Sequence, residues 1–157
     1  MNEPAKGVLA TTVRGWNRFV AEREKMEKAA HQVAEIVNKV IAEHLAYLKA
    51  QNINTSSEAM TLMGSPVEVV PDVEAIYPTV KTMVHLRCAG ATRSIIVNPN
   101  LSVSAGGVPI AIDQLTIGIP DQFAVNAAEF LRDAFLNAAK AATTKENLPE
   151  PAGSSMR

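Results

Sequence analysis

The sequence predicts an α+β protein with a long N-terminal amphipathic helix, an antiparallel β-meander of four to five strands, and a C-terminal helix packed on the sheet. Apolar residues recur at intervals of three and four over the first third of the chain, alternate with polar residues from Thr79 to Cys88, and return to helical spacing after Asp121. These are the periods of helix, strand and helix. We expect one domain over residues 1–142 and a flexible tail at 143–157.

The N-terminal helix is expected over residues 12–51. A heptad seam runs along it, made of Trp16, Phe19, Met26, Ala30, Val33, Val37, Val40 and Tyr47, with Arg23 and His44 in the two remaining positions. Arg23 and His44 either set the register of a buried seam or mark places where the seam faces solvent. Asn52 and Asn54 are plausible ends of the helix.

A connector follows the helix. Thr55 and Glu58 have the spacing of a capping box, which predicts a short helix at 57–63, closed by Gly64. We expect the strand region to span 66–119 and to begin with a short edge strand at 66–70 between two prolines. Residues 72–77 are predicted to form a loop or a single helical turn.

The strongest strand is predicted from Thr79 to Cys88, where residues alternate between a dry and a wet face. Further strands are expected at 92–98, 101–104, 108–112 and 115–119, joined by short turns that contain glycine, asparagine or aspartate. Asp121 follows Pro120 and is a suitable N-cap for a C-terminal helix over 121–142.

Composition and motif spacing argue against several chemistries. Fifteen basic and sixteen acidic residues give a net charge of −1, whereas duplex DNA binders usually carry a basic surplus. Cys88 and His85 lie three apart on a strand and point to opposite faces, so they form no dyad. The three histidines lack metal-site spacing, and the glycine turns do not open helices. We therefore assign no catalytic, cofactor or metal residue and favour a non-enzymatic role.

The wet face of the strand region is a candidate ligand-binding face. Lys81, His85 and Arg87 share one side of the main strand, and Arg93 lies on the next strand. Such a face could bind single-stranded nucleic acid or a small ligand. Nucleic-acid readers usually add aromatic side chains for stacking, and the sequence has none between Pro78 and Gln122. An ordinary solvated face is therefore favoured.

Length supplies the main functional argument. A helix over 12–51 would be about 60 Å long, whereas a domain of this size is roughly 40 Å across. Either the helix breaks, with Gly15 and Ala29 as the weakest points, or one end projects. A projecting end would expose a partner interface, which we assign to Trp16, Phe19, Val20, Arg23 and Met26.

The expected function is that of a structural or protein-interaction subunit that forms homo-oligomers or a larger assembly through this helix. A phage or virus particle or accessory protein is the specific role ranked first. The alternatives are a small binding module that uses the polar sheet face and an enzyme whose site is assembled between subunits. We expect no cofactor. Location in the cytoplasm, or assembly there into a larger particle, is expected because the chain has one cysteine and no membrane-length apolar run.

Overall fold

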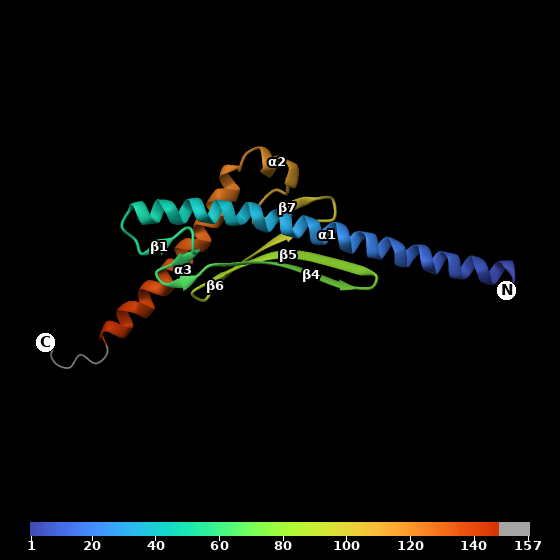
Figure 1. The fold of residues 1–157 in the computed structure, drawn as a ribbon, viewed down its shortest axis with the longest axis horizontal. Helices are drawn as coiled ribbons and strands as arrows, with labels where there is room; N and C mark the ends of the chain where they lie inside the picture. Colours follow the sequence, from blue (N-terminus) through green and yellow to red (C-terminus); the bar gives the residue numbers. More distant parts are fainter. Residues whose placement is uncertain (148–157) are drawn as a thin grey trace. The chain divides into compact units, whose positions relative to one another are not determined.

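The computed structural model describes residues 1–147 and has the predicted α+β fold (Figure 1). A long N-terminal helix is followed by a five-stranded antiparallel sheet and a C-terminal helix that packs on it. The chain forms two compact units. Unit 1 comprises Met1–Ile36, Val70–His85 and Ser94–Ile119; unit 2 comprises Val37–Val69, Leu86–Arg93 and, within the described chain, the segment from Pro120 onward. Most of the predicted tail, 148–157, lies outside the described residues.

Helix α1 spans Glu3–Ala50 without a break (Figure 1). It begins nine residues before the predicted start, where the Ala5 N–H donates to Asn2 Oδ1 at 2.8 Å. It ends with Asn52 in the left-handed region at φ 67° and the Ile53 N–H bonded to the Leu48 carbonyl, which is the Schellman pattern. The predicted alternative of a break near Gly15 or Ala29 is wrong.

The predicted helix at 57–63 is wrong, because this segment belongs to a small antiparallel sheet in unit 2. Its strands are β1 (Thr55–Ser56), β2 (Thr61–Leu62) and β3 (Ser65–Pro66), in the order β1-β2-β3. The Thr55 hydroxyl donates to the Leu45 carbonyl at 3.0 Å instead of capping a helix. Met60, Met63 and Gly64 have positive φ angles, which turn the chain between strands.

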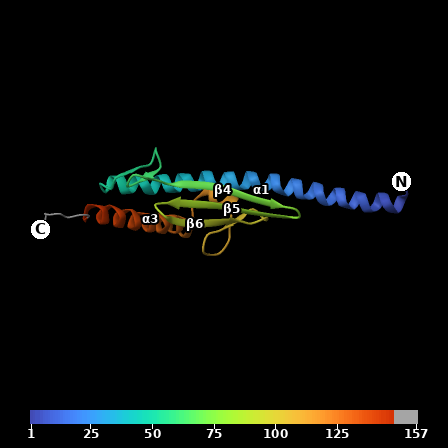
Figure 2. The ribbon, with the colours of Figure 1, turned by 90° about the horizontal axis from the view of Figure 1, so that it is seen from below.

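The main sheet has the order β4-β5-β6-β7-β8. Its strands are β4 (Glu68–Ile76), β5 (Thr79–Cys88), β6 (Ala91–Val97), β7 (Ser102–Ser104) and β8 (Ile110–Ala111), and Figure 2 shows β4, β5 and β6 side by side. The predicted alternation in β5 is confirmed, because Thr82, Val84, Leu86 and Cys88 are buried while the intervening residues are more exposed.

Residues 72–76 belong to β4, so the loop predicted at 72–77 is wrong. The proline and the acidic residues around it made this segment resemble a loop in the sequence. Pro71 is tolerated in the strand because β4 lies at the edge of the sheet, where a missing N–H need not break the ladder.

The strand predicted at 115–119 is also wrong. Residues Ile112–Ile117 form helix α2. Ile112 and Leu115 are buried three residues apart, on one side of a helical turn, whereas Ile117 and Ile119 are 89% and 36% exposed. The period-two pattern of Leu115, Ile117 and Ile119 therefore did not correspond to a shared buried face.

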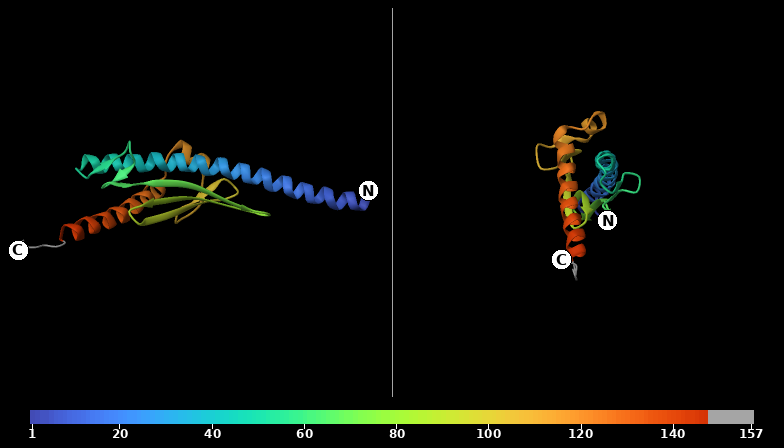
Figure 3. Two further views of the ribbon diagram at one scale, coloured as in Figure 1. Left: turned by 60° about the horizontal axis from the view of Figure 1, so that its bottom comes forward. Right: turned by 90° about the vertical axis from the view of Figure 1, so that its left-hand side faces the viewer.

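Helix α3 spans Asp121–Asn147, beyond the predicted end at 142 (Figure 3). Its buried apolar side belongs to the core of unit 2 and consists of Phe123, Ala127, Phe130, Leu131 and Ala134. Polar contacts join α3 to the strands of the same unit: Arg93 pairs with Glu129 and Asp133, and the Asn137 amide donates to the Ala89 carbonyl at 3.0 Å. These contacts fasten α3 to the β5–β6 hairpin.

Candidate functional site

In unit 1 an aromatic cluster holds α1 against the turn between β4 and β5. Ring centroids lie 5.5 Å apart for Trp16 and Phe19, 5.8 Å for Trp16 and Tyr77, and 5.3 Å for Phe19 and Tyr77. Gly15 leaves room here, because a Cβ at this position would lie 3.0 Å from the Tyr77 hydroxyl, which is a tight contact. Gly15, which was predicted as a possible break in the helix, therefore allows Tyr77 to approach α1.

The N-terminal part of α1 exposes several large apolar side chains. Leu9, Val13 and Trp16 are 51%, 55% and 51% exposed, and Val20 is partly exposed. These four residues are spaced four, three and four apart, so they form one line along the helix, which we call the outer stripe. At about 100° per residue it lies roughly a quarter turn from the buried Phe19 and Met26. Val8, 67% exposed, lies outside this line.

The predicted partner interface divides between these two lines. Trp16 is half exposed, Val20 is partly exposed and Arg23 is exposed, but Phe19 and Met26 are only 7% and 1% exposed. Phe19 and Met26 are therefore core residues of their own chain, and their side chains are not available to a partner. The sequence reading overlooked Leu9 and Val13, although their spacing to Trp16 and Val20 was a detectable signal.

The predicted ligand-binding face is occupied partly by internal contacts. In unit 1, the His85 ring lies between two neighbouring strands, with Nδ1 2.8 Å from Ser94 Oγ and Nε2 3.1 Å from Asp72 Oδ2. A neutral ring protonated on Nε2 satisfies both contacts: it donates to Asp72 and accepts from the Ser94 hydroxyl. Lys81 is exposed on the same side of β5.

Asp72, His85 and Ser94 are the residue types of a nucleophilic triad. They lie on three different strands, so no local sequence motif marks them. Acyl transfer would also need donors for an oxyanion and a cavity for the substrate. The adjacent hollow has a volume of about 160 Å³, and the carboxylates of Asp72 and Glu74 line it beside Lys81. Because two carboxylates would oppose a developing oxyanion, we interpret the trio as a cross-strand hydrogen-bond network.

The two arginines of the predicted face lie in unit 2. Arg87 is exposed. Arg93 is 3.5 Å from Glu129 and 3.3 Å from Asp133, so it serves the packing of α3. Partial desolvation raises the pKa of Asp133, but hydrogen bonds and charge from Arg132 and Arg93 outweigh this effect and hold that pKa below its usual value.

Cys88 is a core thiol. It is 3% exposed, and burial raises its pKa, which disfavours the reactive thiolate. Within the described part of the chain, no group of three histidine, cysteine, aspartate or glutamate side chains is placed to hold a metal ion. Likewise, none of the helices in residues 1–147 combines the length and the apolar character needed to cross a membrane.

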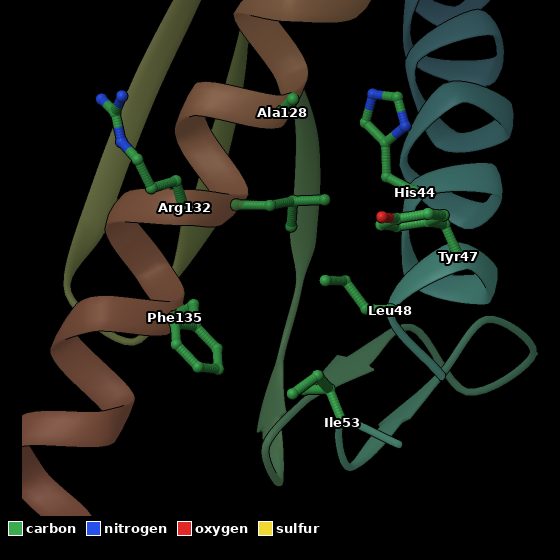
Figure 4. Close-up of a pocket in the computed structure, with 8 residues that line it drawn as sticks. His44, Tyr47, Leu48, Ile53, Ala128, Arg132 and Phe135 are labelled. Carbon is green, nitrogen blue, oxygen red and sulfur yellow. The ribbon is translucent and has the colours of Figure 1, made fainter. Parts of the chain in front are cut away.

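Unit 2 contains an apolar cavity of about 370 Å³ beside the last turns of α1 and the middle of α3 (Figure 4). We call it the unit 2 groove. Its lining consists of His44, Tyr47, Leu48, Ile53, Ala128, Leu131, Arg132 and Phe135. His44 is half-buried, and its Nε2 lies 3.0 Å from the Ala124 carbonyl oxygen.

The two polar positions of the predicted heptad seam have different environments. Arg23 is exposed to solvent, and His44 joins α1 to α3.

Comparisons with protein-family models, with curated proteins and with solved structures found no match to this chain. Within residues 1–147 the structure is that of an α+β protein that leaves the outer stripe of unit 1 and the groove of unit 2 apolar and exposed.

Proposed function

We propose that this protein is a non-enzymatic structural or interaction subunit that self-associates through the N-terminal part of α1. The observation that carries the proposal is the outer stripe. Leu9, Val13 and Trp16 are each about half exposed on one line of a regular helix. Contiguous apolar surface of this kind marks an interaction site, because covering it removes apolar area from water.

The segment around the stripe is suited to contact with protein. Its neighbours on either side of the line are the uncharged residues Ala10, Thr12 and Asn17, so docking would leave few charges to desolvate. A helix with an unpacked apolar line also gains order when a partner covers it, since most helical stability in proteins comes from packing.

A second copy is the simplest partner, because one surface is then reused in every contact. A symmetric contact through this one surface closes as a dimer, and a phage or virus particle or an accessory protein is one setting in which such a subunit could serve. The polar sheet face is a weaker candidate, since His85 and Arg93 already bind groups of their own chain.

The test is the mass of the protein in solution. Wild type should sediment as an oligomer at micromolar concentration, and Leu9→Glu with Val13→Glu should sediment as a 16.8 kDa monomer with an unchanged circular dichroism spectrum. Thr11→Glu with Arg18→Gln is the matched control: it changes net charge by the same amount on the opposite side of the helix. The control should assemble like wild type.

Two results would count against the proposal. A wild-type monomer at these concentrations would mean that the stripe does not mediate self-association. Equal loss of assembly in the stripe variant and in its control would mean that net charge, and not the apolar line, governs association.

A further inference from the structure

We infer that two copies pair antiparallel through their outer stripes, and that the β4–β5 turn of each copy covers the N-terminal part of the other copy's α1. The inference rests on the proposed function. It adds the orientation of the pair and a second contact surface, formed by Ile76 and Tyr77 at that turn. All of the residues involved belong to unit 1.

The N-terminal part of α1 is not packed against its own chain. The helix begins at Glu3, and its first buried residue is Phe19. The segment between them makes about four helical turns. A helical segment that nothing covers is only marginally stable in water, because most helical stability in proteins comes from packing. We therefore expect another molecule to cover this segment.

Three more apolar side chains are exposed around this part of unit 1. Val8 is 67% exposed, and Ile76 and Tyr77 at the β4–β5 turn are 76% and 51% exposed. The Tyr77 ring lies 5.8 Å from the Trp16 ring, so the turn continues the apolar surface of the stripe. Residues 75–80 carry no charge, so a partner that covers the turn would desolvate none there.

Val8 lies on the side of α1 that faces the sheet further along the helix. It precedes Phe19 by eleven residues, which is about three helical turns, so both side chains point to nearly the same side. Phe19 packs against the Tyr77 ring. Val8 lies about 16 Å before Phe19 along the helix axis and has no such cover in its own chain. A second copy can supply that cover with its own turn.

Only an antiparallel pair brings Val8 to the turn of the partner. In such a pair the two-fold axis crosses both helices, so the sides that carry Phe19 face the same way and each turn lies beside the other copy's α1. In a parallel pair the two-fold axis runs along the helices, so these sides face opposite ways. Val8 and Ile76 then stay uncovered.

The spacing of the stripe fits the antiparallel orientation. Its four residues are four, three and four apart, and this series is the same when it is read backwards. An antiparallel pair therefore places Leu9 of one copy opposite Val20 of the other, and Val13 opposite Trp16. The turn, which touches α1 near Trp16 and Phe19, then lies level with residues 10–14 of the partner, within about one helical turn of Val8.

The turn also supplies area that the stripe lacks. The stripe is about 18 Å long on a helix about 10 Å wide, which corresponds to roughly 200 Å². A stable interface covers about 800 Å² per partner. A contact made by the stripes alone is therefore too small, and the antiparallel pair adds two contacts between a turn and a helix, one at each end.

Cysteine cross-linking distinguishes the two orientations. The variants are Leu9→Cys and Val20→Cys, each made alone at an exposed or partly exposed position. A disulfide needs Cα atoms within about 7 Å. In an antiparallel pair the two Leu9 positions are about 16 Å apart along the axis, as are the two Val20 positions, whereas Leu9 and Val20 of different copies are opposite.

After mild oxidation, an equimolar mixture of the two variants should therefore contain a covalent dimer with one chain of each kind, identified by its intact mass. Neither variant should cross-link when it is alone. Wild type is the control and should not cross-link, because its single cysteine, Cys88, is buried.

A charge pair tests the contact between the turn and the helix. Ile76→Glu should raise the Kd of the dimer about tenfold, as loss of a buried interface side chain does, and Val8→Lys should also weaken it. Mixed dimers of these two variants should form in preference to either homodimer, because the new charges then attract. Val108→Glu is the matched control: Val108 is 79% exposed and lies between β7 and β8, at the edge of the sheet opposite β4.

Each contrary outcome has its own meaning. If Leu9→Cys and Val20→Cys each cross-link alone, the pair is parallel and the inference is wrong. If wild type is a dimer but neither the variants nor their mixture cross-link, the stripes do not face each other, and the inference fails while self-association stands. If Ile76→Glu dimerises as tightly as Val108→Glu, the turn is not a contact surface. If wild type is a monomer, the proposed function fails and the inference fails with it.

Discussion

Phe19 and Leu9 should respond in opposite ways to truncation, since one is core and the other is exposed. Phe19 is 7% exposed and packs with Trp16 and Tyr77, so Phe19→Ala should cost about 3 kcal/mol of unfolding free energy, at the low end for a buried phenylalanine. Leu9 is 51% exposed, so Leu9→Ala should change the stability of the monomer by less than about 0.5 kcal/mol.

On self-association the order should be the opposite, with the larger effect for Leu9→Ala. Full burial of a leucine side chain contributes roughly 1.5–3 kcal/mol. Because Leu9 has about half of its surface left to bury, its truncation should weaken each contact by about 1 kcal/mol, or roughly fivefold in Kd.

Urea unfolding followed by circular dichroism measures stability. Phe19→Ala is introduced into the stripe variant, which is expected to be monomeric. Its midpoint should fall by about 1–2 M for Phe19→Ala. Sedimentation over a concentration series measures association for Leu9→Ala. If Phe19→Ala left the midpoint unchanged in that background, or if Leu9→Ala left association unchanged, the assignment of Phe19 to the core and of Leu9 to the interacting surface would be refuted.

Three further outcomes follow from the contacts in the chain. Cys88 should react with a disulfide reagent about tenfold or more slowly in the native protein than in urea, because it is buried and its pKa is raised; equal rates would contradict its burial. Ser94 should stay unlabelled by a fluorophosphonate probe; stoichiometric labelling that His85→Gln abolishes would instead make the cross-strand trio catalytic. Because the pKa of Asp133 is lowered in the folded state, its pairing with Arg93 stabilises the protein above the unfolded-state value of about 3.9 and is lost as pH falls through the folded-state value. Arg93→Leu should therefore lower the urea midpoint at neutral pH and have little effect in acid; an equal effect at both pH values would exclude this pairing as the cause.

The long helix and the main strand could be predicted because many residues repeat one period. The alternation from Thr82 to Cys88 in β5 and the seam from Met26 to Val40 in α1 each give a consistent pattern of burial in the structure. The wrong predictions fall in short segments, where only a few residues determine the secondary structure. At Thr55 a capping pattern was overridden by a hydrogen bond to the Leu45 carbonyl, and at Ile112 and Leu115 two buried residues fix a short helix that an alternating pattern concealed.

The candidate sites were harder to predict from the sequence. The seam through Phe19 and the outer stripe through Trp16 and Val20 run side by side on α1, so the sequence could not tell which line its own chain covers. The unit 2 groove combines Leu48 and Ile53 with Phe135, which is far away in the sequence. Such a site follows from tertiary packing and has no local pattern.

Fluorescence of Trp16 over a dilution series tests the central claim most directly. Trp16 is the only tryptophan in the sequence and belongs to the outer stripe, where it is half exposed in the single chain. If the stripe docks on another copy, its emission should be blue-shifted in concentrated protein and should move to the red on dilution, in step with the loss of sedimenting oligomer. The stripe variant should show the dilute-state emission throughout. An emission maximum that stays constant while the oligomer dissociates would contradict the claim, because assembly would then proceed without the stripe.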